Sequence, residues 1–154
     1  MELFIGRVSD VGELQGYSKK NTFEGWEVWI KNINTDRCHY YETKTDHVLC
    51  MVWGNFYSAQ DINPAVEAAE AYGKDGENGV FEMDGDFIFV RITPGNNLVV
   101  LQSNYAGMNL YYRQYGNRYA FCTDASVLLN DYCENDIDER SVYDYLLYGS
   151  MVGG

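Results

Sequence analysis

Residues 79–129 of the chain, GVFEMDGDFIFVRITPGNNLVVLQSNYAGMNLYYRQYGNRYAFCTDASVLL, decide the fold. They contain an apolar run at 87–92, interrupted only by Arg91, and a second apolar run at 98–101. The segment between these runs, 93–97, reads TPGNN and is a dense turn signal. Two apolar runs joined by such a turn are typical of a hairpin, so we expect them to pair antiparallel and to be largely buried.

A second hairpin is predicted directly after the first. Apolar and aromatic residues at 110–112 and 119–122 flank the sequence YGNR at 115–118, whose glycine allows a positive φ at a central turn position. The chain then continues into a short predicted helix near Leu129. Together these signals predict a strand meander that leads into a helix.

The rest of the chain carries further strand and helix signals. A helix is predicted to begin at Asn63 and Pro64, because Asn can cap a helix and Pro fits its first position, and Gly73 is expected to end it. The polar segment 16–25 is expected to be a loop. The other predicted elements are strands at 2–8, 26–30, 37–43 and 48–53, and a helix that begins near 138 or 140 and ends at 149. This order predicts an α+β fold with antiparallel sheets.

The composition predicts one domain and argues against two classes of partner. At 154 residues the chain is long enough to bury a hydrophobic core. Its 23 acidic and 11 basic side chains give a formal net charge of -12, which repels phosphate backbones and anionic lipids. We therefore expect neither nucleic acid nor a membrane surface as a partner, and no apolar run is long enough to span a bilayer.

The cysteines and the first residues predict a reducing compartment. Cys38, Cys50, Cys122 and Cys133 are widely spaced without any C-x-x-C pair, and residues 1–7 do not form a signal peptide. The sequence therefore predicts free thiols and a cytoplasmic location.

Several segments, taken in order, resemble the N-terminal domain of the asparagine synthetase family. In that family the domain carries the elements NGxFAFxxxD, LFLARDxxGxxPLYY and FASExKALL. The counterparts in this chain are residues 84–89, 98–101, 106–112 and 121–129. Residues 60–73 are similar to the family's SDxEVLLxAYxxWG helix, and residues 141–149 look like its closing helix.

This resemblance implies a class II glutamine amidotransferase domain. Its fold would be an N-terminal-nucleophile hydrolase-like αββα sandwich, in which helices flank two antiparallel sheets. Residues 1–154 would form that single domain within a longer protein. The resemblance places Asp61 where the family binds the α-amino group of glutamine. It also places Gly54 and Asn55 in the element that builds the oxyanion hole, with Trp53 where that element has its Asn.

The residues that perform the family's chemistry have no counterparts here. Glutamine hydrolysis needs a cysteine as the first residue after removal of the initiator Met, so that its thiolate attacks the side-chain amide. In this chain Glu2 follows Met1, and the first cysteine is Cys38. The Arg-Gly-Pro-Asp element that would hold the glutamine carboxylate is also absent. We therefore predict no catalytic residue and no cofactor.

The resemblance then implies a degenerate glutaminase domain that acts as a scaffold, substrate platform or partner interface, as in β-lactam synthetases and lasso-peptide cyclases. Its expected partners are an ATP-dependent synthetase domain, in cis beyond Gly154 or in trans, and an amino-acid or peptide substrate. A second hypothesis is a stand-alone acidic β-rich module that binds a small ligand or a protein through its aromatic surface. A third is an active glutaminase with unusual N-terminal processing.

Asp61 also has a simpler interpretation. A carboxylate at the entry of a helix meets the positive end of the helix dipole and is stabilised there without any ligand. The pair Asp84 and Asp86 is spaced like the two acids of a glycosidase, but the intervening Gly85 favours a turn or the start of a strand.

Two Cys and His pairs suggest a metal site. They are Cys38-His39 and His47-x-x-Cys50. On a strand, residues one or three apart point to opposite faces, so neither pair can chelate one ion. We therefore predict packed thiols and ordinary histidines, and no metal.

Overall fold

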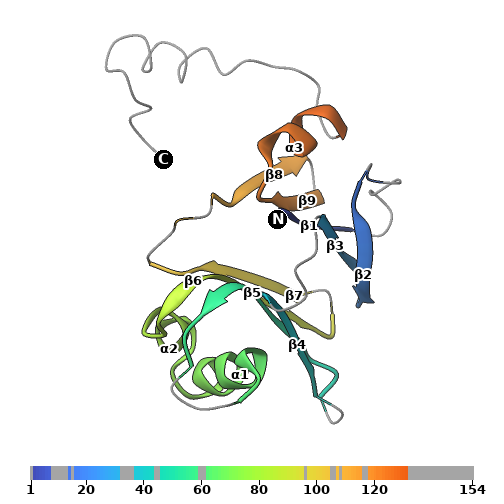
Figure 1. The fold of residues 1–154 in the computed structure, drawn as a ribbon. Coiled ribbons are helices and arrows are strands. Elements are labelled where there is room, and N and C mark those ends of the chain that lie inside the picture. Colours follow the sequence, from blue (N-terminus) through green and yellow to red (C-terminus); the bar gives the residue numbers. More distant parts are fainter. Residues whose placement is uncertain are drawn as a thin grey trace.

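The computed structural model describes residues 2–7, 14, 16–31, 37–43, 46–58, 62–95, 97–104, 107, 109–115 and 118–131. Within these ranges the chain forms nine strands and three helices, and the strands make two antiparallel sheets (Figure 1). The predicted α+β class with antiparallel sheets is therefore confirmed. Among the described helices, none is long and apolar enough to cross a membrane.

One sheet, sheet B, consists of consecutive strands from the middle of the chain, in the order β4-β5-β6-β7. The strands are β4 (Cys38–Glu42), β5 (Leu49–Phe56), β6 (Gly85–Thr93) and β7 (Asn97–Gln102). The first predicted hairpin is confirmed as β6 and β7, with Val90 opposite Val100. Most of β6 is buried, whereas β7 is only half-buried because it forms an edge of the sheet.

The other sheet, sheet A, combines strands from both parts of the chain that flank sheet B, in the order β2-β3-β1-β9-β8. The strands are β1 (Glu2–Arg7), β2 (Ser18–Phe23), β3 (Trp26–Lys31), β8 (Tyr111–Tyr115) and β9 (Arg118–Cys122). The central strand is β1, which lies between β3 and β9. Its pairing with β9 is extended by Thr123, whose backbone N–H donates to the Leu3 carbonyl at 3.0 Å.

The two sheets pack face to face, and helices cover both outer faces (Figure 1). The helices are α1 (Pro64–Asp75), α2 (Glu77–Phe81) and α3 (Ala125–Asp131). Between the sheets lies a cluster of apolar side chains from both, namely Leu3, Ile5, Trp26, Val28, Ile30, Leu49, Met51, Trp53, Ile88, Val90 and Ile92. Smaller clusters fill the space between sheet B and α1 and α2, and between sheet A and α3. The layers therefore run helix, sheet, sheet, helix.

Helix α1 begins where its sequence predicts. The Asn63 side chain accepts a hydrogen bond from the Ala65 backbone N–H at 2.9 Å, and Pro64 occupies the first turn. The prediction that Gly73 ends the helix is wrong. Gly73 is exposed and has open space around it, so the helix continues to Asp75 and ends at Gly76, whose N–H donates to the Tyr72 carbonyl.

The prediction of one continuous meander in 79–129 is also wrong. Both hairpins form, since β8 pairs with β9 from Tyr111 and Cys122 to Tyr115 and Arg118. They belong to different sheets, however, because β6 and β7 lie in sheet B and β8 and β9 in sheet A. The chain crosses from one sheet to the other between Gln102 and Tyr111. The start of this stretch is helical rather than extended, because α2 precedes β6.

A strand occupies the segment 16–25, where we expected a loop. Ser18–Phe23 pair with β3 and form an edge of sheet A, with a bulge between Lys19 and Asn21. A polar edge strand of this kind looks like a loop in sequence because it lacks a continuous apolar pattern. The turn to β3 consists of Glu24 and Gly25, both with positive φ (48° and 80°), as a two-residue hairpin turn of type I′ requires. The helix predicted at 138–149 lies outside the described residues.

Candidate functional site

A cavity of about 460 Å³ lies where β5 ends and β6 begins. Among the described residues it is lined by Tyr57, Asp84, Gly85 and Asp86. Tyr57 is 71% exposed, so its side chain is accessible to solvent. The cavity therefore combines an accessible aromatic ring with two acidic residues.

Gly85 allows β6 to start against β5. It lies opposite Phe56 and has a φ of +144°, and a Cβ at this position would collide with the Asn55 carbonyl oxygen. The pairing continues one step further, since the Tyr57 backbone N–H donates to the Asp84 carbonyl at 3.0 Å. Glycine at this position therefore allows the two strand ends that border the cavity to pair closely.

Ser103 and Gly107, which lie in the segment that crosses between the sheets, form hydrogen bonds with the same end of β6. The Gly107 N–H donates to Asp86 Oδ1 at 3.1 Å, and a Cβ on Gly107 would lie 2.6 Å from Asp86 Oδ2. One residue further along β6, the Phe87 N–H donates to Ser103 Oγ at 3.1 Å, and the Ser103 N–H donates to the Phe87 carbonyl at 3.0 Å. The bond from Gly107 fixes the Asp86 carboxylate at the cavity wall.

Two of the three predicted ligand residues lie on β5 near this cavity, but neither is among the described residues that line it. Gly54 and Asn55 lie near the end of β5, where Asn55 is the register partner of Asp86. Gly54 is buried with a φ of +130°, and Asn55 is half-buried. The third residue, Asp61, lies outside the described residues.

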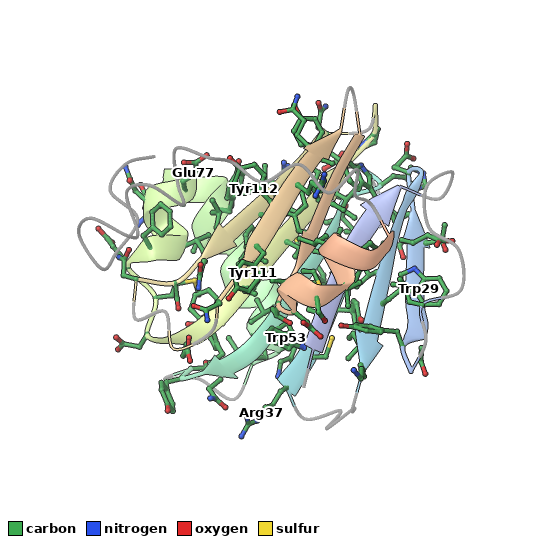
Figure 2. All side chains as sticks on the ribbon, turned by 90° about the horizontal axis from the view of Figure 1, so that it is seen from above. Trp29, Arg37, Trp53, Glu77, Tyr111 and Tyr112 are labelled. Carbon is green, nitrogen blue, oxygen red and sulfur yellow. The ribbon has the colours of Figure 1, made fainter. Side chains whose placement is uncertain are left out.

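Trp53, the residue before Gly54, points the other way, into the space between the sheets. Its side chain is 1% exposed and belongs to the apolar cluster there, and Figure 2 shows it near the centre of the molecule in that view. The indole Nε1 has no hydrogen-bond partner among the described residues. The Trp53 ring is therefore part of the packed core between the sheets.

A second buried polar atom lies in the same region. Tyr40, on β4, packs against the inter-sheet cluster, and its hydroxyl also lacks a hydrogen-bond partner within the described part of the chain. Burial, with a smaller contribution from the neighbouring Cys38, raises the pKa of Tyr40 far above its usual range. The hydroxyl is therefore neutral at physiological pH.

The described thiols are not arranged as nucleophiles. Cys38, Cys50 and Cys122 are not in disulfide bonds, and burial raises the pKa of Cys50 to about 11, although the nearby Arg91 opposes the shift. Cys122 is buried, and its sulfur accepts a hydrogen bond from the Asp124 N–H at 3.4 Å. A reactive cysteine needs a lowered pKa and access to solvent, and Cys50 has neither. Within the described ranges, no group of three or more His, Cys, Asp or Glu side chains could hold a metal ion.

Sequence reasoning missed the contribution of Tyr57 to the cavity. Among the described residues, the other large hydrophobic side chains that are 40% exposed or more are Ile62, Tyr111, Tyr112 and Tyr119, and Figure 2 places Tyr111 and Tyr112 on β8. A tyrosine at the end of a buried strand has no sequence feature that distinguishes a cavity wall from an ordinary surface position. A search for known relatives gave no match to any family model or curated protein.

Proposed function

We propose that this chain is a degenerate class II glutamine amidotransferase domain of the asparagine synthetase type. In this proposal it has an N-terminal-nucleophile hydrolase-like fold, does not hydrolyse glutamine, and serves as a scaffold or a substrate and partner platform for an ATP-dependent synthetase domain. The order helix, sheet, sheet, helix supports the fold assignment. The observation that carries the functional part is the burial of Trp53.

By the resemblance, Trp53 stands where the family has the Asn of its oxyanion hole. An oxyanion hole needs donors that point at a site which the substrate carbonyl can enter. Trp53 offers no amide, and its indole is enclosed by apolar side chains from both sheets, including Val28 and Ile88. A glutamine side chain therefore has no room beside this residue.

The strand that would carry the nucleophile lacks one. In this proposal β1, the central strand of sheet A, corresponds to the strand on which the family's N-terminal cysteine lies. Its sequence is ELFIGR, without Cys, Ser or Thr. The described thiols lie on β4, β5 and β9 instead, at Cys38, Cys50 and Cys122.

The first test is a glutaminase assay on the purified chain. We expect no glutamate release from glutamine above a buffer control. Glutamate release that disappears in one of the variants Cys38→Ala, Cys50→Ala or Cys122→Ala, but persists in the other two, would contradict the proposal and favour an active glutaminase.

The second test concerns the partner. The chain would be co-purified with the ATP-dependent synthetase domain encoded in the same reading frame or next to it, and ATP-dependent pyrophosphate release would be measured. We expect release to fall at least about tenfold, or about 1.4 kcal/mol in the apparent barrier, when this chain is omitted. An unrelated acidic protein of similar size is the control. Equal activity with and without the chain would overturn the platform role.

The cavity at Tyr57 favours a second candidate function, a binding module for a small cationic ligand. An aromatic face attracts an ammonium group, and Asp84 and Asp86 add negative charge at the same place. In that case the chain would bind an organic ammonium ion by itself, Tyr57→Ala and Asp84→Asn would weaken binding, and the exposed Glu77→Gln would not. Binding of this kind without any effect on a synthetase would favour the second candidate.

A further inference from the structure

A smaller cavity lies on the outer face of sheet B, which is the face that packs against α1. It is bounded by the sheet, by the β4–β5 hairpin and by helix α1. Its volume is about 140 Å³. The lining residues that matter here are Thr43, Asp46, Cys50, Tyr72 and Arg91. Because it faces α1 and not the other sheet, this cavity is separate from the space around Trp53 and does not depend on the amidotransferase proposal.

Arg91 is the charged residue that interrupts the apolar run 87–92. Its register partner on β5 is Cys50, and its guanidinium carbon lies 5.0 Å from the centre of the Tyr72 ring. Tyr72 in turn stacks on Phe89, with ring centres 5.8 Å apart and planes inclined by 30°. The ring therefore covers one face of the guanidinium and orients it, and no N–H of the guanidinium donates to another described residue.

Arg91 has no counter-charge in the described part of the chain. No carboxylate there lies within 4.0 Å of its guanidinium, although the protein has an excess of 12 negative charges. Asp46, which also lines the cavity, is exposed and does not form an ion pair with Arg91. A half-buried guanidinium is costly without an anion, because burial removes part of its hydration.

The other polar groups of the cavity can donate hydrogen bonds. Thr43 Oγ1 accepts from the Val48 N–H at 3.0 Å, so the hydroxyl is fixed in place and its own hydrogen remains to be donated. The Cys50 thiol is neutral, because burial raises its pKa to about 11, and it adds no negative charge. The cavity thus combines one oriented cation and neutral donors with the exposed carboxylate of Asp46.

We propose that this cavity binds a small oxyanion, held by the Arg91 guanidinium through paired N–H···O bonds and assisted by the Thr43 hydroxyl. The fork of an arginine side chain matches the two oxygens of a carboxylate or a phosphate. A volume of about 140 Å³ admits a small carboxylate or inorganic phosphate but excludes a nucleotide. Both ligands share this chemistry, and the experiment distinguishes them.

The experiment titrates the whole chain with sodium acetate, sodium malonate and sodium phosphate, each compared with sodium chloride at the same ionic strength. We expect at least one oxyanion to raise Tm by about 2 °C or more at saturation, which chloride does not do. The two carboxylates and phosphate are separate arms, so the arm that responds identifies the ligand class. Equal shifts with all four salts would mean general screening and would overturn the proposal.

Three variants locate the binding. In Arg91→Gln we expect the dissociation constant to rise at least about tenfold, and in Arg91→Lys nearly as much, because the charge remains but the fork is lost. Lys74→Gln is the matched control, since it removes one positive charge from an exposed position on α1. Unchanged affinity in both Arg91 variants, or an equal loss in Lys74→Gln, would contradict the assignment.

A second measurement keeps the test decisive if the Arg91 variants fail to fold. In the unaltered protein, the oxyanion that raises Tm is expected to shift the backbone amide resonances of Thr43, Cys50 and Gly73, while those of β8 stay in place. Shifts confined to other regions would place the anion elsewhere and refute the proposal.

Discussion

The two faces of sheet B differ in what covers them and in what they contain. The fully buried side chains of the inner face, packed against sheet A, are apolar, such as Met51, Trp53 and Val90, and Cys38 and Tyr40 of β4 pack against them. The outer face, packed against α1 and α2, contains apolar residues as well, but also a thiol and a guanidinium at the paired positions Cys50 and Arg91. Among the described residues of the two faces, the charged guanidinium therefore lies on the outer face.

The difference follows from how sheets and helices cover a surface. Two sheets that pack face to face lie about 10 Å apart and interdigitate along their length, so they leave little space for a charged group. A helix covers only a strip of a sheet. Beside that strip, a long side chain such as Arg91 can keep its body on the apolar sheet and bring its charge toward solvent. A cavity therefore forms at the margin of α1, and none is expected around Trp53.

The first prediction has the largest expected effect on stability. It tests whether the side chains between the two sheets are tightly packed around Trp53. Trp53→Ala should lower the free energy of unfolding by about 3–5 kcal/mol, because it removes a fully buried indole and leaves a cavity. Trp53→Phe should cost much less, since the lost N–H has no partner among the described residues. Urea denaturation measures both values.

The half-buried Trp29 provides the control for this comparison. Its indole N–H donates to Glu27 Oε2 at 3.0 Å, and its ring packs only partly against the core beneath α3. We expect a smaller loss for Trp29→Ala than for Trp53→Ala. Equal losses of unfolding free energy in the two variants would mean that the layer between the sheets is not packed more tightly than the layer beneath α3.

The second prediction concerns helix α1, which packs on the outer face of sheet B. Asn63→Ala should lower the free energy of unfolding by about 1 kcal/mol, because it removes the cap of α1. It also removes the bond from Asn63 Nδ2 to the Tyr40 carbonyl at 3.0 Å, which ties α1 to β4. Asn78→Ala, at an exposed helix position in α2, is the matched control and should change stability little. Identical free energies of unfolding for the two variants would show that the Asn63 side chain does not stabilise the start of α1.

The third and smallest prediction concerns pH on the outer face. An unfolded thiol loses its proton near pH 9.0, whereas folding raises the pKa of Cys50 to about 11. Between these values unfolding releases a proton, so stability should fall as pH rises from about 9 to about 11 and should show no contribution from Cys50 below that range. The Tm measured by thermal unfolding should therefore fall less steeply with rising pH across this window in Cys50→Ala than in the unaltered chain. Parallel curves would contradict the prediction.

Local signals predicted the hairpins and the start of α1, because each depends on neighbours in sequence. The turn TPGNN between two apolar runs determines β6 and β7, and Asn63-Pro64 determines the helix start. The assignment of β8 and β9 to sheet A was not predictable, since nothing within a hairpin specifies which sheet it joins. Strand β2 was missed because it is a polar edge strand, although Glu24-Gly25 is a recognisable two-residue turn.

The candidate sites were predictable only in part, for a similar reason. The sequence identified Gly54 and Asn55 by resemblance and marked Arg91 as the exception in an apolar run. It did not reveal that Arg91 lies opposite Cys50 or beneath Tyr72, because register and helix placement are tertiary features. The direction of the Trp53 side chain likewise depends on the pairing of β5 with its neighbours.

The nested order of the strands has a consequence for synthesis of the protein. Every strand of sheet B, together with α1 and α2, comes from residues 38–102, whereas sheet A needs residues 2–31 and also 111–122. A chain leaving the ribosome therefore has all the strands of sheet B before β9, the second neighbour of β1, has been made. Pairing β1 with β9 closes a loop of more than a hundred residues, as between Phe4 and Cys122, and such distant pairings form slowly. We expect sheet B to form first and to serve as the template on which the first and last strands assemble.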